Sequence, residues 1–241
     1  MNSVKHICLW SGPRNISTAL MYSFAQRNDT KVFDEPLYAY YLKHHPEAHS
    51  YHPGAEDILS IMENDGNNVI EAMLNNTEKH VLFYKHMTHH LLDLNREFMK
   101  LTINIILTRN PKEMLPSFDK VIDNPSMNDV GYALHTELLH YFITHQIPFT
   151  VLDSKKVLLN PEETLHKLCD FIEIPFDKFM LSWKPQQRQE DGIWAKYWYD
   201  SVHKSSGFIP YKAKSELFPE HLNALLKECL PHYKELMTHS I

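Results

Sequence analysis

The 241-residue sequence predicts a three-layer α/β/α fold with a central, mostly parallel sheet. Short apolar runs recur along the chain, and most are followed by a stretch with helical periodicity, which is the order that parallel strands with crossover helices require. No repeat, low-complexity tract or linker rich in Pro, Gly and Ser divides the chain. Hydrophobic residues make up 43% of the sequence, enough for an ordinary core. We therefore expect a single domain over residues 1–241.

Five apolar runs are the expected strands. The run Ile103–Leu107 is predicted to be central, because it is β-branched and nearly continuous, as burial on both faces of a sheet demands. In chain order, the expected strands are 7–10, 32–33, 81–84, 103–107 and 149–152.

Helical periodicity follows or separates these runs. The apolar positions of each stretch recur at three- and four-residue spacing, which places them on one helix face. In chain order, the expected helices are 16–26, 55–62, 69–74, 91–99, 130–142, 162–171 and 221–230.

Two aromatic segments show neither period. Residues 38–54 mix tyrosines with histidines, and residues 186–211 carry tryptophans and tyrosines among polar residues. We expect the first to be a loop that forms an aromatic, hydrogen-bonding wall of a ligand site. The second is predicted to be a long irregular cap or lid over one end of the sheet.

Charge and cysteine content exclude several classes of protein. A formal net charge of -6 argues against a nucleic-acid or anionic-membrane binder. Cys8, Cys169 and Cys229 lie far apart, which argues against a disulfide framework and a thiolate zinc site. The first residues run into a strand and resemble neither a signal peptide nor a membrane span. We expect a cytoplasmic protein.

Histidine and glycine content narrow the choice of ligand. The chain has 17 histidines, but none stands in an H-E-x-x-H motif, so we expect no metal site. It has 6 glycines, and neither G-x-G-x-x-G nor G-x-x-x-x-G-K-[ST] occurs. A phosphorylated ligand would therefore have to be bound without a standard glycine-rich loop.

The segment after the first strand has the composition of an anion site. A turn, an arginine and two hydroxyls open a helix, so free backbone N–H groups, the positive end of the helix dipole and a guanidinium converge. The alternative is that Ser17 and Thr18 only begin a helix and Arg14 is a surface charge. The residues of this candidate site are Gly12, Pro13, Arg14, Asn15, Ser17 and Thr18.

The segment after the fourth strand offers a second anion site. Asn110 is a suitable N-cap and Pro111 a suitable first helical residue, which places Arg109 at the carboxyl end of the strand. Ser117 follows about two helical turns later and could share a phosphate with Arg109. The alternative is a capped helix with an exposed serine.

Together these two segments resemble the phosphate-binding elements of sulfotransferases that use 3′-phosphoadenosine 5′-phosphosulfate (PAPS). Arg14, Ser17 and Thr18 match the family's 5′-phosphate element, and Arg109 and Ser117 match its 3′-phosphate element at the family's spacing. Residues 151–172 are similar to the segment after the family's late strand. The resemblance implies a P-loop-like strand-loop-helix, PAPS as cosubstrate and no metal.

The match departs from the family at two places. Many cytosolic members have lysine where Arg14 stands and glycine where Ile16 stands. The family's basic C-terminal loop is represented here by Lys204, Ser206 and Gly207, which the resemblance places over the nucleotide.

Sulfuryl transfer needs positive charge on the leaving phosphate and the transferring group. Arg14 is the first candidate, and Lys85, at the end of the third strand, is the second. A solvated lysine at a strand end is the alternative for Lys85.

Transfer also needs a base for the acceptor hydroxyl. The resemblance implies Glu35, which Pro36 holds out of helical geometry at the end of the second strand. Asp34 is a competitor. His86 is an alternative base, but it directly follows the lysine, whereas the family's histidine comes two residues after it. This shift reverses the expected side-chain direction.

The leading hypothesis is a PAPS-dependent sulfotransferase acting on a hydroxyl, or less readily an amine, of a small molecule. One alternative is an ATP-dependent small-molecule kinase of the P-loop class. Another is a nucleotide-binding protein of the same fold without catalysis. We expect the acceptor pocket between residues 38–54 and 194–208. The sequence leaves the acceptor and the oligomeric state open.

Overall fold

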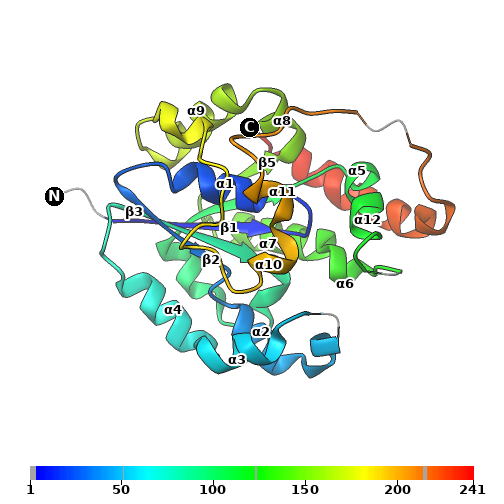
Figure 1. Ribbon diagram of the computed structural model, residues 1–241, viewed down its shortest axis with the longest axis horizontal. Coiled ribbons are helices and arrows are strands. Elements are labelled where there is room, and N and C mark those ends of the chain that lie inside the picture. Colours follow the sequence, from blue (N-terminus) through cyan, green and yellow to red (C-terminus); the bar gives the residue numbers. More distant parts are fainter. Residues whose placement is uncertain (1–3, 51, 123, 214–215) are drawn as a thin grey trace.

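A five-stranded parallel sheet forms the centre of the molecule (Figure 1). The computed structural model describes residues 4–50, 52–122, 124–213 and 216–241. The strand order is β2-β3-β1-β4-β5, and every neighbouring pair is parallel. The predicted fold class and all five predicted strands are confirmed. The strands are β1 Lys5–Ser11, β2 Thr30–Asp34, β3 Val81–Met87, β4 Ile103–Thr108 and β5 Phe149–Asp153.

Helices cover both faces of the sheet, because successive side chains of each strand point to opposite sides. Ile7 and Leu9 of β1 belong to a core formed with α1 (Ser17–Phe24) and α9 (Pro161–Ile172). Cys8 and Trp10 belong to the core on the other face, which includes α4 (Gly66–Asn75) and α7 (Tyr132–Thr144). The three-layer arrangement follows from this alternation.

The other helices lie around these layers. Six of the seven predicted helices correspond to α1, α3, α4, α7, α9 and α12, with shifted ends. The α-helices whose bounds have not yet been given are α2 Tyr38–His44, α3 Ala55–Ile61, α5 Pro111–Phe118, α6 Met127–Val130, α8 Ser154–Leu159, α10 Ala195–Trp198, α11 Asp200–His203 and α12 Asn223–Met237. The 3-10 helices are η1 Pro46–Ser50, η2 Thr88–Leu91, η3 Arg96–Leu101, η4 Lys178–Leu181 and η5 Glu220–Leu222.

Two predictions were wrong in detail. The helix expected at 91–99 is replaced by η2 and η3, because Leu92 has a φ of 42° and breaks the turn between them. The segment 38–54, expected to be a loop, forms α2 and η1. The sides of α2 are occupied almost entirely by buried tyrosine, alanine and leucine, so it shows no amphipathic period.

Segment 186–211 passes over the carboxyl ends of the strands and contains the short helices α10 and α11 (Figure 1). The Asp191 carboxylate ties it to α1, accepting a hydrogen bond from the Tyr22 hydroxyl at 2.7 Å. His203 lies 2.9 Å from the same carboxylate. Within the described residues, no helix combines the length and apolar character needed to cross a membrane.

Candidate active site

A cavity of about 1040 Å³ lies at the carboxyl ends of the strands. Its wall includes residues that follow β1, β2, β3 and β4, which is where open parallel sheets bind ligands. Residues of α2, η1 and segment 186–211 complete it. The two segments expected to form the acceptor pocket therefore reach the same cavity. The predicted residues in its wall are Gly12, Pro13, Arg14, Asn15, Ser17, Thr18, Glu35, Lys85, Arg109 and Gly207.

The turn between β1 and α1 forms the first end of the cavity. Arg14 and Ile16 have φ values of 57° and 61°, in the left-handed region that side chains disfavour. Alternating backbone conformations of this kind turn successive N–H groups toward one point, which suits an anion. A Cβ on Gly12 would lie 2.9 Å from the Val130 carbonyl oxygen, so glycine is needed for the close approach of α6.

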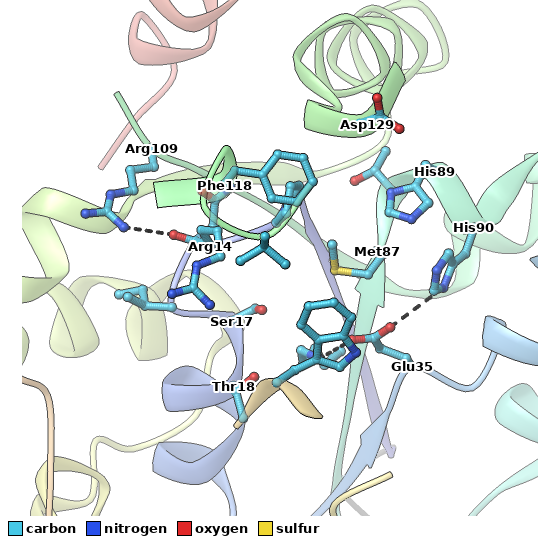
Figure 2. A pocket seen from close by; sticks show the side chains of 18 of the residues that line it. Arg14, Ser17, Thr18, Glu35, Met87, His89, His90, Arg109, Phe118 and Asp129 are labelled. Atoms are coloured by element: carbon cyan, nitrogen blue, oxygen red, sulfur yellow. Dashed lines mark hydrogen bonds and ion pairs between the residues drawn. The ribbon is translucent and has the colours of Figure 1, made fainter. Parts of the chain in front are cut away.

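Arg14 and Arg109 come together at this end (Figure 2), and Ser117 is hydrogen-bonded to Arg14. The Arg109 guanidinium donates to the Arg14 carbonyl at 2.9 Å, and Arg14 Nε donates to Ser117 Oγ at 3.3 Å. Burial and the neighbouring Arg109 charge lower the pKa of Arg14. Arg109 Nε lies 3.9 Å from Glu113 Oε2, whereas Arg14 has no carboxylate partner in the described part of the chain, so the charge of Arg14 is available to an anion. Ser117 is not among the described residues of the cavity wall.

A buried ion network forms the floor of the cavity. The Lys85 ammonium donates to Asp34 Oδ1 at 2.8 Å, to Glu35 Oε1 at 2.5 Å and to the Tyr199 hydroxyl at 2.7 Å. These three bonds use all the protons of the ammonium. Burial alone would lower the pKa of Lys85, but the two carboxylates raise it well above its usual value. The Lys85 ammonium, which was expected to contact the transferring group, is therefore already bonded to protein side chains.

Asp34 and Glu35 have different surroundings in this network. Asp34 Oδ2 accepts from the Tyr199 hydroxyl at 2.8 Å and from the Gly192 N–H at 3.1 Å, so this carboxylate fastens segment 186–211 to β2. Asp34 is not among the described residues of the cavity wall, whereas Glu35 is. Of the two adjacent carboxylates, Glu35 is therefore the one that the structure describes at the cavity.

Glu35 is held in a strained conformation. Its φ is 45°, although the following proline had predicted extended backbone, and its N–H donates to the Lys85 carbonyl at 2.8 Å. Burial raises the pKa of the Glu35 carboxyl. The Lys85 ammonium opposes this shift, and the Asp34 carboxylate adds to it. A raised pKa suits a base that works near neutral pH.

His86, which the sequence suggested as an alternative base, lies outside the described cavity wall. Its ring stacks on Trp10 at a centroid distance of 4.5 Å, on the face of the sheet opposite Lys85. Both ring nitrogens are buried without hydrogen-bond partners among the described residues, and His86 does not line the cavity. The alternation along β3 explains this, because adjacent residues point to opposite faces.

The C-terminal loop also differs from expectation. Lys204 pairs with Asp200 at 2.6 Å, and both Lys204 and Ser206 lie outside the part of the cavity wall that the structure describes. Gly207 does line it, and a Cβ there would lie 2.8 Å from the Leu181 carbonyl oxygen. Lys212 also lines the cavity and brings a basic side chain that no sequence motif had indicated.

Three further polar residues were missed at the opposite end of the cavity: His89, His90 and Asp129 (Figure 2). The two histidines closely follow the third strand, and this position could have indicated that they lie at the cavity. Asp129 comes from α6, and no feature of the sequence indicates its place. In the described ranges no three His, Cys, Asp or Glu side chains are grouped as metal ligands would be.

Comparison with known proteins gives a consistent result. A sulfotransferase-domain family model matches residues 5–240. Two Arabidopsis thaliana proteins, branched-chain-amino-acid aminotransferase-like proteins 2 and 1, are 39% and 41% identical over 95% of this chain, which spans 41% of the length of each. The sulfotransferase domain of the Synechococcus PCC 7002 olefin synthase has the same fold, with a TM-score of 0.59, 16% identity and 94% coverage of both chains. The chain belongs to the sulfotransferase domain family.

Proposed function

We propose that this protein transfers the sulfuryl group of PAPS to a hydroxyl of a small molecule. The observation that carries the proposal is the paired guanidinium site: Arg14, without a carboxylate partner in the described structure, beside Arg109, at the mouth of α1. This site shares one cavity with the buried Glu35 carboxylate. A doubly phosphorylated nucleotide at one end and a hydroxyl acceptor at the other would meet at Glu35.

The nucleotide would be held by side chains rather than by a glycine-rich loop. Ser17, Thr18 and the backbone N–H groups of the β1–α1 turn suit the 5′-phosphate, with the positive end of the α1 dipole behind them. Arg109 and Ser117 suit the 3′-phosphate, as in the sequence resemblance. Guanidinium groups remain charged at all working pH values and bind phosphate through two N–H groups at once.

The chemistry requires in-line attack and a base. The acceptor oxygen attacks sulfur, the bond from sulfur to the 5′-phosphate oxygen breaks, and its electron pair leaves on that phosphate. The acceptor proton passes to Glu35. Arg14 would stabilise the charge that develops on the leaving phosphate. Lys85 would act indirectly, by holding Glu35 Oε1 in place.

Binding of the product 3′-phosphoadenosine 5′-phosphate (PAP) tests the nucleotide site. PAP at about 100 times its Kd should stabilise the protein by about 2.7 kcal/mol, seen as a rise in Tm. Arg14→Ala and Arg109→Ala should each weaken PAP binding about tenfold or more, since each removes charged hydrogen bonds. Arg96→Ala is a matched control, because Arg96 also lines the cavity but its guanidinium is already paired with Glu137. Absence of stabilisation at millimolar PAP would contradict the proposal.

Transfer itself tests Glu35. Glu35→Gln should keep PAP affinity and lower sulfuryl transfer from PAPS about 100-fold or more, as expected for loss of a general base. Wild-type protein that binds PAP and transfers nothing to a panel of alcohols, phenols and amines would support the non-catalytic alternative. Magnesium-dependent ATP turnover would instead support the kinase alternative.

A further inference from the structure

His90 is a buried imidazole with an unused ring nitrogen at the acceptor end of the cavity. It lies in η2, is 1% exposed and lines the cavity wall. Its ring is stacked between Tyr38, at a centroid distance of 4.8 Å, and Tyr41, at 4.7 Å. Nδ1 has no hydrogen-bond partner within the described residues. Buried polar atoms normally have partners, so an orphan at a cavity wall indicates a ligand contact.

The unused nitrogen faces the free oxygen of Glu35. Nδ1 of His90 lies 4.0 Å from Glu35 Oε2, while the other carboxylate oxygen is engaged by Lys85 (Figure 2). This separation is too long for a hydrogen bond, which has a heavy-atom distance of about 2.7–3.2 Å. An oxygen atom about 2.8 Å from both atoms is nevertheless compatible with this separation, because that triangle closes.

We propose that Glu35 Oε2 and His90 Nδ1 together bind the reacting hydroxyl oxygen of the acceptor. This inference rests on the proposed function. The hydroxyl donates its proton toward Glu35 Oε2 and accepts a hydrogen bond from the N–H of His90. Its remaining lone pair points to the sulfur. His90 keeps its proton throughout, so it is a positioning residue, and Glu35 receives the acceptor proton.

The two-point contact selects the class of acceptor. The bound group must donate to a carboxylate and accept from an N–H, which an alcohol does. A carboxylate or phosphate lacks the proton, and an ammonium lacks the lone pair. Burial lowers the pKa of His90 well below its usual value, and the neighbouring His89, His52, His86 and Lys85 lower it further. The ring is therefore neutral near pH 7 and serves as a donor.

Two substitutions separate positioning from proton transfer. His90→Phe keeps an aromatic ring between the two tyrosines and removes the N–H. His90→Asn places an amide N–H near the position of Nδ1 and cannot act as a base. The assay uses radiolabelled PAPS with water and methanol as acceptor probes, and measures release of sulfate and formation of methyl sulfate. PAP affinity, measured in parallel, shows whether each variant is folded.

The inference predicts that His90→Phe slows both reactions about tenfold, with PAP affinity unchanged, because it loses one hydrogen bond in the transition state. His90→Asn should stay within about threefold of wild type and keep the wild-type pH profile. A fully active His90→Phe overturns the inference alone, and so does an inactive His90→Asn that still binds PAP. Wild-type protein that neither binds PAP nor consumes PAPS overturns the proposed function as well.

Discussion

Removal of the Lys85 ammonium should be among the most damaging single changes in the active site. Lys85 is 1% exposed and is the counter-charge for the buried Asp34 and Glu35 carboxylates. Loss of one partner from a buried ion pair costs about 3–5 kcal/mol, because the remaining charge is stranded in a poorly solvated site. Since domains are stable by about 5–15 kcal/mol, Lys85→Met should lose a large part of the free energy of unfolding.

The free energy of unfolding that Lys85→Met loses should depend on pH. Without Lys85, the buried Glu35 carboxyl loses its counter-charge, so its folded-state pKa rises further above the usual value near 4.5. Groups with a raised folded-state pKa contribute stability below their unfolded pKa, and this stability is lost as pH rises. The deficit of Lys85→Met is therefore expected to be larger at pH 7.5 than at pH 5.0.

Lys31 on the adjacent strand β2 supplies a matched control. It pairs with Glu78 at 2.5 Å, and the two side chains are 40% and 58% exposed. An exposed pair of this kind contributes about 0–1 kcal/mol. Urea unfolding followed by tryptophan fluorescence, at both pH values, compares Lys85→Met with Lys31→Met. The reasoning is refuted if the two variants lose equal stability at pH 7.5, or if the Lys85→Met deficit is the same at pH 5.0.

Three other predictions follow from the same geometry. Because the Glu35 pKa is raised, transfer activity should rise with pH through an inflection above 4.5, and Glu35→Gln should remove that inflection from the pH–rate profile. Burial and Lys85 lower the pKa of His86 to about 3, so between pH 6.5 and 5 wild type should lose about 2 kcal/mol more stability in urea unfolding than His86→Phe does. Lys212→Ala should weaken PAP binding in calorimetry and Lys204→Ala should not, because Lys212 lines the cavity and Lys204 pairs with Asp200.

The sheet and one end of the site could be predicted because both depend on short stretches of sequence. Each apolar run marks a strand, and parallel strands bring their carboxyl ends to one edge. That rule alone brings Arg14 and Arg109 together from positions 95 residues apart. A capping asparagine and a first-turn proline indicate the start of α5, and the geometry of this helix then brings Ser117 to Arg14.

The other end of the site depends on contacts that no local pattern encodes. The role of Lys85 is set by Tyr199, which lies 114 residues away in segment 186–211. Asp129 reaches the cavity from a four-residue helix, too short for any periodic signal. The place of His90 depends on a single 3-10 turn after β3, where the sequence had predicted a continuous α-helix from residue 91.

The network of Lys85 links the segment over the cavity to the base beneath it. Tyr199 and Gly192 belong to segment 186–211, and both donate to Asp34, which in turn accepts from Lys85. Lys85 holds Glu35, and burial keeps the Glu35 pKa raised. Solvent reaching this network would favour the ionised carboxylate and lower that pKa. The basicity of Glu35 therefore depends on segment 186–211 lying over the strand ends, so one set of hydrogen bonds both covers the cavity and tunes the residue proposed to accept the proton.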